Sequence, residues 1–186
     1  MNTVQPIRDP AVIQEMKEYL KNSSSKNPKI CLRNYFLFTF GINVGLRISD
    51  IITLKASDVT GSHVSLVERK TGKNRRYKLN SMLKKEIADY CKQAGKESYL
   101  FPSQKGGHIT RVQAYNIINN AAKHVGLEFE VGTHTLRKTF GYWHYKQYKD
   151  VAALQILFNH ASASDTLRYI GIEQDQLDEL ADKFFI

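Results

Sequence analysis

The sequence predicts an α+β fold that is mainly α-helical with a small antiparallel β-sheet. Apolar residues recur at helical spacing over most of the chain. Residues 63–79 instead alternate apolar and polar side chains around a glycine-containing turn. The chain has 186 residues, the size of one domain, and it contains no internal repeat. We therefore expect a single domain over residues 1–186 with its own hydrophobic core.

The N-terminal third of the chain is predicted to form three helices. Asp9 followed by Pro10 is typical of a helix N-cap and first turn, and apolar residues recur after this pair. A second, more apolar helix is predicted from Pro28 through Phe40, with Gly41 and Gly45 at its end. A shorter helix is expected to begin at Ser49.

A β-hairpin follows these helices. His63 to Arg69 and Arg76 to Leu79 are predicted as two short strands, and Lys70 to Asn74 as the turn between them. The tip of this hairpin is basic, so it is suited to contact with an anion.

The rest of the chain returns to helical patterns. One helical stretch is predicted from Ser81 onward. Further helices are predicted from Thr110 to Gly126, from His134 to Tyr148 and from Val151 to Phe158, and the last one from Gln174 to Phe184. A further small helix between the last two is expected to carry Tyr169.

The charge balance favours a polyanionic partner. Lys and Arg number 27 against 18 Asp and Glu, a formal net charge of +9. Such an excess suits nucleic acid or an anionic membrane surface, although it also serves solubility alone. The two cysteines are too few for a disulfide framework, and no stretch is apolar enough for a signal or membrane-spanning segment. We expect a cytoplasmic protein without a membrane partner.

Three groups of residues could carry chemistry. Arg47 follows the Gly45 turn among apolar neighbours, where it needs an anionic partner, either a ligand or an ion pair with Asp50 or Asp58. His134 and Arg137 share one face at a helix N-terminus, where backbone N–H groups already favour a phosphate; the alternative is an exposed polar face without a role.

The third group is His160 and Tyr169, which are nine positions apart. A short polar linker between them can present Tyr169 on its own small helix. The alternatives are structural, because the chain has ten tyrosines that can serve in packing, and His160 can cap the preceding helix.

Taken together, the order and spacing of these groups resemble the tyrosine recombinase (phage integrase) family. The matching segments are Gly45-Leu46-Arg47-Ile48-Ser49-Asp50, Arg69-Lys70-Thr71-Gly72, His134-Thr135-Leu136-Arg137-Lys138-Thr139-Phe140, and Leu157-Phe158-Asn159-His160 through Tyr169. Asn159 stands where the family usually has glycine, and asparagine is the next most tolerant residue of a left-handed helix end. The family's N-terminal core-binding domain is expected to be absent, so that residues 1–186 form the catalytic domain alone.

The resemblance implies site-specific DNA strand cleavage and rejoining through a 3′-phosphotyrosyl intermediate, without a metal or cofactor. The sequence agrees, since it lacks metal-ligand motifs and dense carboxylate clusters. The implied catalytic residues are Arg47, Lys70, His134, Arg137, His160 and the nucleophile Tyr169. Lys70 is the implied acid for the leaving 5′-oxygen, with Lys73 as its competitor, and His134 is a candidate acceptor of the Tyr169 proton.

The expected partner is double-stranded DNA, with self-association into a tetramer in the synapse through the segment from Asp175 to Ile186. Four apolar residues of that segment either dock on a neighbouring protomer or pack on their own domain: Leu177, Leu180, Phe184 and Phe185. Expected DNA contacts are Arg69, Lys73, Arg75, Arg76, Arg111, Lys138 and Arg168. The rival functions are a DNA-binding module of weak catalytic power and a monomeric topoisomerase; an all-helical interaction protein with a basic face is a third, unrelated possibility.

Overall fold

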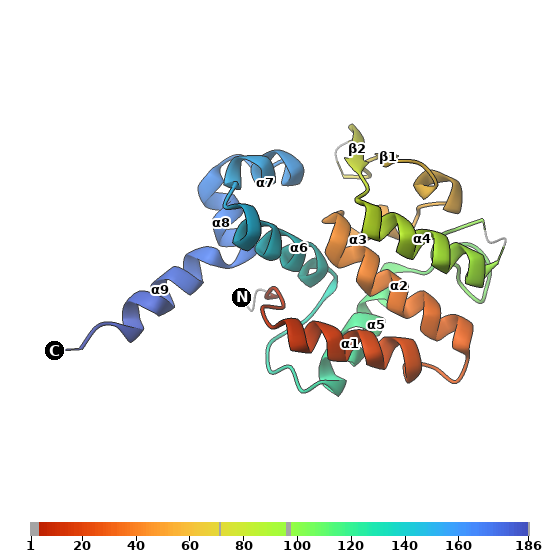
Figure 1. The fold of residues 1–186 in the computed structure, drawn as a ribbon, viewed down its shortest axis with the longest axis horizontal. Helices are drawn as coiled ribbons and strands as arrows, with labels where there is room; N and C mark the ends of the chain where they lie inside the picture. Colours follow the sequence, from red (N-terminus) through yellow and green to blue (C-terminus); the bar gives the residue numbers. More distant parts are fainter. Residues whose placement is uncertain (1–3, 71, 96–97, 186) are drawn as a thin grey trace.

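The computed structural model describes residues 4–70, 72–95 and 98–185. Its elements in order are α1 (Pro10–Asn22), α2 (Pro28–Val44), α3 (Ile48–Ile51), the 3₁₀-helix η1 (Ala56–Val59), β1 (His63–Val67), β2 (Asn74–Lys78), α4 (Ser81–Ala94), α5 (Arg111–His124), α6 (Thr133–Tyr148), α7 (Val151–Phe158), α8 (Ala163–Ile170) and α9 (Ile172–Asp182). The predicted class, mainly helical with one small antiparallel sheet, is confirmed (Figure 1). Among the described residues, no helix is both long enough and apolar enough to span a membrane.

Helix α2 forms the centre of the main core. Its side chains Phe36, Phe38 and Phe40 are fully buried, and α1, α4, α5 and α6 all pack against it. The prediction that it ends at Phe40 was wrong by one turn, because Gly41 lies inside the helix. Its missing side chain lets α6 approach: a Cβ there would lie 2.6 Å from Cδ1 of Leu136. Gly45, in the left-handed conformation, is the residue that ends the helix.

The hairpin pairs β1 with β2 in the antiparallel sense, with Val64 opposite Tyr77. Both of these side chains are buried against the main core. The first strand ends at Val67 and the second starts at Asn74, each two residues earlier than predicted, so the two strands are equal in length and residues 68–73 connect them. Thr71, which belongs to the predicted turn, lies outside the described residues.

Helices α6, α7 and α8 enclose a second, smaller core. It consists of Tyr142, Leu154, Phe158, Ile170 and Ile172. Gly141 of α6 makes this packing possible, since a Cβ there would lie 2.8 Å from the buried Phe158 ring. Helix α8, which carries Tyr169, is therefore held against α6 by close contact. The sequence indicated this small helix, which Ser162 caps through a hydrogen bond from the Asp165 amide.

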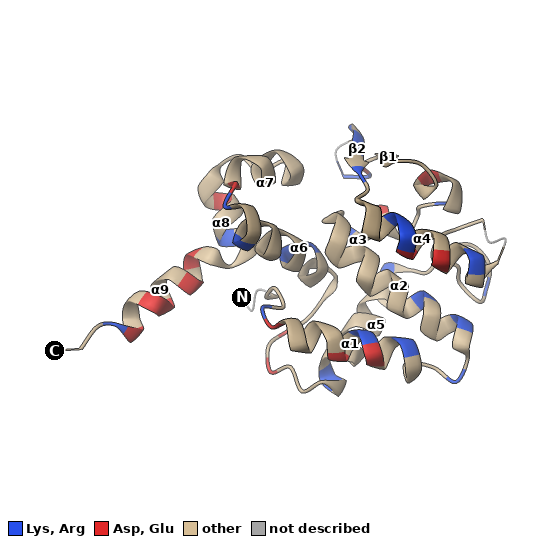
Figure 2. Cartoon of the chain, in the orientation of Figure 1, with Lys and Arg blue, Asp and Glu red and all other residues tan. Residues whose placement is uncertain are grey.

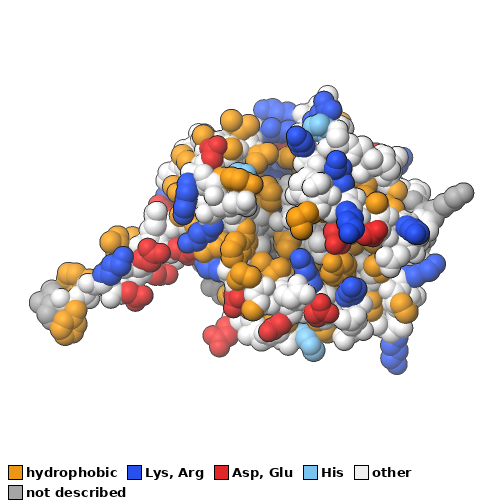
Figure 3. Space-filling view, in the orientation of Figure 1, with side chains coloured by type: hydrophobic (Ala, Val, Ile, Leu, Met, Phe, Trp, Pro, Cys, Tyr) orange, Lys and Arg blue, Asp and Glu red, His pale blue; other side chains and the backbone are white. Residues whose placement is uncertain are grey.

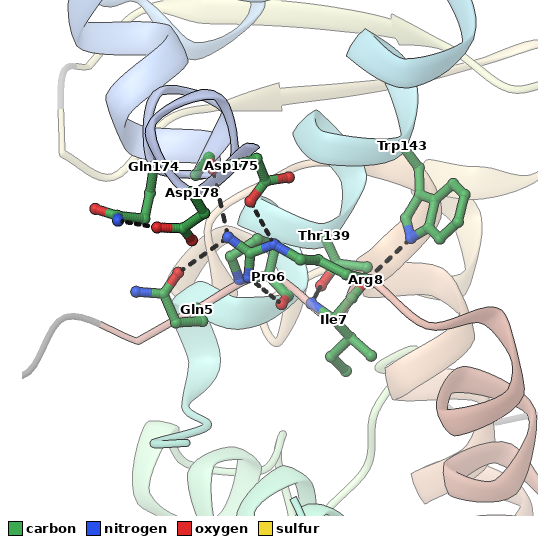
Figure 4. A network of polar contacts seen from close by, with 10 residues as sticks. Gln5, Pro6, Ile7, Arg8, Thr139, Trp143, Gln174, Asp175 and Asp178 are labelled. Carbon is green, nitrogen blue, oxygen red and sulfur yellow. Dashed lines mark hydrogen bonds and ion pairs between the residues drawn. The ribbon is translucent and has the colours of Figure 1, made fainter. Parts of the chain in front are cut away.

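The N-terminal segment before α1 lies across the base of the C-terminal helices as a strap, formed by residues 5–8 (Figure 4). The Ile7 amide donates to Oγ1 of Thr139 at 2.9 Å, and Nε1 of Trp143 donates to the Ile7 carbonyl at 3.0 Å. Arg8 forms an ion pair with Asp175 at 2.8 Å and donates to the Gly171 carbonyl at 3.3 Å. The strap thus joins α6 to the start of α9.

Helix α9 extends away from the rest of the molecule (Figure 1). It starts at Ile172 and ends at Asp182, two residues earlier at each end than predicted. Leu177, Leu180, Phe184 and Phe185 are 56%, 65%, 73% and 98% exposed, so the alternative in which they pack on their own domain is wrong. Acidic residues cluster along this helix (Figure 2), although the chain as a whole is basic.

Candidate active site

A basic pocket of about 530 Å³ lies between the hairpin, α3 and the N-termini of α5 and α6. Its lining residues are Arg47, Ile48, Ser49, Arg69, Lys70, Arg111, Thr133, His134 and Arg137. The structure therefore brings four predicted catalytic residues and two predicted DNA contacts into one cavity. None of the described residues that line it is acidic, so its charge suits a phosphate group. Basic side chains also gather around the hairpin in Figure 3.

Arg47 reaches this pocket from the N-terminus of α3, directly after the Gly45 turn. Its Nη1 lies 3.2 Å from Oε2 of Glu68, which is the ion pair the structure forms. The predicted alternatives, Asp50 and Asp58, are occupied elsewhere. Asp50 accepts from the Arg69 amide at 3.0 Å, and Asp58 accepts from the Lys55 amide at 2.8 Å. The choice between Asp50 and Asp58 as partner was therefore wrong.

Arg137 is the most deeply buried cation of the site, with 3% of its surface exposed. Its Nη1 donates to the Gly45 carbonyl at 2.6 Å and its Nη2 to the Phe158 carbonyl at 3.1 Å. The guanidinium also lies over the Phe158 ring, 4.4 Å from its centroid. Burial lowers the pKa of Arg137, but a guanidinium remains charged near neutral pH. The hydrogen bonds to these two carbonyls fix the orientation of the Arg137 guanidinium.

His134 lies at the first turn of α6, where its imidazole opens into the pocket. Burial in the pocket lowers its pKa first, and the charges of Arg137, Lys138, Arg111 and Arg47 lower it further. His134 is therefore a neutral imidazole at neutral pH, which can accept a proton.

His160 follows the left-handed residue Asn159, which ends α7 with φ 55°. Its Nδ1 lies 3.1 Å from Oγ1 of the buried Thr166, and this contact orients the ring. Desolvation, followed by the charge of Arg137, lowers the pKa of His160. Asn159 preserves the turn, as expected for a residue that tolerates this conformation.

Tyr169 on α8 is half-buried beside His160, with ring centroids 5.0 Å apart. Burial raises the pKa of its phenol. The positive charges of Arg137 and Arg47 oppose that rise. Lys138 lies over the Tyr169 ring, 5.1 Å from its centroid. His160 and Tyr169 therefore lie beside Arg137, at the α7–α8 side of the site. Arg47 and Lys70 lie at the opposite side, toward the hairpin.

The remaining predicted DNA contacts are distributed around the pocket. Lys73 is exposed near the hairpin tip, Arg75 lies 3.6 Å from Glu68, and Nη2 of Arg76 lies 3.2 Å from Nδ1 of His63. Arg168 forms an exposed ion pair with Glu173 at 3.0 Å. Among the described residues, no group of three or more His, Cys, Asp or Glu side chains is arranged to hold a metal ion.

The profile of the phage integrase family matches residues 9–175. The chain belongs to the phage integrase family. Its functional class is therefore site-specific DNA recombination by a tyrosine recombinase, and the family and class predicted from the sequence are confirmed.

Named relatives of this recombinase agree with the family. This chain is 49% identical over 177 residues to the probable integrase/recombinase YoeC of Bacillus subtilis, and the match covers 94% of this chain and 93% of YoeC. It is 31% identical over 158 residues to the tyrosine recombinase XerD of Corynebacterium glutamicum, covering 80% of this chain. The match spans 51% of XerD, about half its length.

Solved structures share the fold. The XerA recombinase crystal structure superposes with a TM-score of 0.73 at 20% identity, covering 97% of this chain and 66% of XerA. The XerH recombinase, bound to a palindromic difH substrate in a post-cleavage complex, gives a TM-score of 0.73 at 22% identity. That match covers 97% of this chain and 53% of XerH.

Sequence reasoning missed two residues that support the site, Glu68 and Thr166. Both are buried and polar, with exposures of 1% and 0%. Glu68 stands out in the sequence as the acidic residue of an otherwise basic hairpin, which is a usable signal. Thr166 has no such signal, because its role depends on the direction in which the α7–α8 turn presents His160.

We predict that His134 is neutral at pH 7 in the free protein, because its pKa is lowered from the ordinary value of about 6.5. An NMR titration of the histidine rings, with His134→Asn used to assign the signal, measures this midpoint. It should lie below that of the urea-unfolded chain, and inorganic phosphate should raise it, since a bound anion favours imidazolium. A midpoint at or above the unfolded value without phosphate contradicts the prediction.

Proposed function

We propose that this recombinase cleaves and rejoins double-stranded DNA by direct attack of Tyr169 on a phosphodiester held in the basic pocket. The observation that carries the proposal is the position of Arg137, which lines the pocket while its guanidinium lies over the Phe158 ring against which Tyr169 packs. A phosphate held by this guanidinium lies within reach of the phenol. The charge that develops on the nonbridging oxygens then meets Arg47 and Arg137, with His160 as a further donor.

In the proposed step, the Tyr169 oxygen forms a bond to phosphorus and the bond from phosphorus to the 5′-oxygen breaks. Burial raises the pKa of Tyr169, so the phenol enters the reaction protonated and must lose that proton. Neutral His134 is the proposed acceptor. Lys70 on the hairpin is the proposed donor to the departing 5′-oxygen. A 5′-hydroxyl from a second strand reverses the attack, so the energy of the phosphodiester is kept.

Two of the predicted DNA contacts line the pocket, and two others contact residues of the protein itself. Arg69 and Arg111 line the pocket and can contact backbone phosphates. Lys138 and Arg75 are part-buried and engaged with Tyr169 and Glu68. We propose that the enzyme acts on DNA in the cytoplasm, and the basic pocket supports this partner. The same pocket in a pure DNA-binding module would shift DNA in a gel without a covalent product.

Replacing Tyr169 by Phe should abolish covalent cleavage, because the nucleophilic oxygen is removed. The measurement uses a pool of nicked duplexes with a randomised core, from which SDS-resistant protein–DNA adducts are isolated and sequenced. Wild-type protein should yield adducts that share a sequence, and Tyr169→Phe none. Tyr145→Phe is the matched control, since this half-buried tyrosine lies outside the site. An adduct that survives Tyr169→Phe sinks the assignment, and DNA binding without any adduct favours the binding module.

Lys70 and Lys73 can be separated by the chemistry of the leaving group. Removing the general acid should slow cleavage by about 10²–10³-fold. A substrate with sulfur in place of the bridging 5′-oxygen should restore the rate, since a thiolate leaves without protonation. We expect Lys70→Ala to be rescued and Lys73→Ala to lose mainly DNA affinity. Rescue of Lys73→Ala instead would reverse the two roles.

We propose that the segment from Asp175 to Ile186 joins copies of the enzyme on DNA into a tetramer. Four large apolar side chains exposed on one projecting segment are unusual on a monomeric protein. A Leu177→Glu/Leu180→Glu double variant should remain folded but lose higher assemblies on the recovered DNA site, as measured by analytical ultracentrifugation. Gln176→Glu controls for added charge on the same helix. Assemblies that persist in the double variant argue for a monomeric, topoisomerase-like enzyme.

A further inference from the structure

The hairpin contains a buried carboxylate that the proposed chemistry does not use. Glu68 follows β1 and has 1% of its surface exposed, although it carries a charge. Burying a carboxylate is costly unless cations and hydrogen-bond donors surround it. Its surroundings therefore indicate what it is for.

Two guanidinium groups approach Glu68 from different elements. Nη1 of Arg47 lies 3.2 Å from Oε2, and Nε of Arg75 on β2 lies 3.6 Å from Oε1. Neither nitrogen makes an aligned hydrogen bond, so both contacts are ion pairs at close range. The Tyr77 hydroxyl also donates to Oε1 at 3.4 Å. Glu68 is thus shared between a residue of the phosphate pocket and the hairpin.

Arg75 extends this contact to the opposite side of the site. Its Nη2 donates to Oδ1 of Asn159 at 3.4 Å. Asn159 occupies the left-handed position immediately before His160. A glycine at this position would form the same turn but could not accept from Arg75. The asparagine side chain therefore adds a contact between the hairpin and the His160 turn.

We propose that Glu68 is a positioning residue of this recombinase, and that the chain of contacts Arg47–Glu68–Arg75–Asn159 sets the distance between the hairpin and the His160 turn. This inference rests on the proposed function, because it concerns how the same site is aligned. Glu68 holds Arg47 toward the pocket from behind, and Arg75 ties the strand that follows Lys70 to the turn that presents His160. Glu68 does not touch the reacting atoms.

The charge of Glu68 is the property that matters. Glutamine has nearly the same shape but leaves Arg47 and Arg75 as two like charges that no carboxylate separates. Arg47 should then shift within the pocket, and small displacements of a positioned group are worth about 10²-fold in rate. DNA affinity should change little, because the number of cations facing the DNA stays the same.

The experiment measures single-turnover cleavage and DNA dissociation constants separately, on the nicked duplex recovered by covalent trapping. Glu68→Gln should cleave about 10²-fold more slowly with unchanged affinity. Glu68→Asp should recover part of that rate, since it restores the charge. Glu128→Gln is the matched control, because Glu128 is exposed on a loop away from the pocket. Wild-type cleavage by Glu68→Gln, or equal losses of rate and affinity, overturns the proposal.

A second pair of variants tests the link across the site even where Glu68→Gln fails to fold. Asn159→Gly keeps the left-handed turn and removes only the Arg75 contact. Alone, it should slow cleavage severalfold; in an Arg75→Gln background it should have no further effect, since both changes break the same contact. Independent, multiplying effects of the two substitutions contradict the proposed chain of contacts.

A measurement on the free protein separates this inference from the cleavage chemistry. The Nε–H proton of Arg75 should be visible by NMR near neutral pH in the wild type, because Nε is buried beside the Glu68 carboxylate and shielded from water, and it should be lost in Glu68→Gln, where the guanidinium is no longer held there. If the wild type forms no covalent adduct yet shows this signal, the proposed function fails and the contact stands. If the signal is missing from the wild type, the positioning role fails whatever the enzyme does to DNA.

Discussion

Burying the guanidinium of Arg137 obliges the chain to supply acceptors for it, and the two carbonyls that do so come from opposite halves of the protein. The Gly45 carbonyl belongs to the end of α2 in the main core, whereas the Phe158 carbonyl belongs to the end of α7 in the smaller core. A helix that ended elsewhere would leave the cation unpaired. The Arg137 guanidinium therefore holds these two helix ends together. Because Arg47 follows Gly45 and His160 follows Phe158, both residues are brought to the same site.

The fold was predictable where local patterns dominate. The Asp9 cap and the alternation of the hairpin placed their elements to within a few residues. The errors came from tertiary contacts, which no local pattern contains. Gly41 lies inside α2, where α6 packs closely against it. The sequence alone does not distinguish a glycine that allows close packing from one that ends a helix.

The site was predictable as a set of residue types but not as a network. The order Arg, Lys, His, Arg, His and Tyr identified the family, which the profile match then confirmed. Ion-pair partners depend on which elements approach in space, so the expectation for Arg47 chose neighbours in sequence rather than Glu68. The sequence proposed Lys138 as a DNA contact, and the structure adds that α6 directs its side chain over the Tyr169 ring.

The strap formed by residues 5–8 has a practical consequence for watching this enzyme work. Arg8 donates to the carbonyl of Gly171, which lies one residue beyond α8, and it pairs with Asp175 in the first turn of α9. The strap is therefore attached where α9 leaves the rest of the molecule. A fluorophore attached at the strap therefore sits beside the pivot of α9, and a second one near Phe185 sits at its far end. Energy transfer between the two would show whether α9 changes its position when copies of the enzyme assemble, with neither dye placed in the basic pocket.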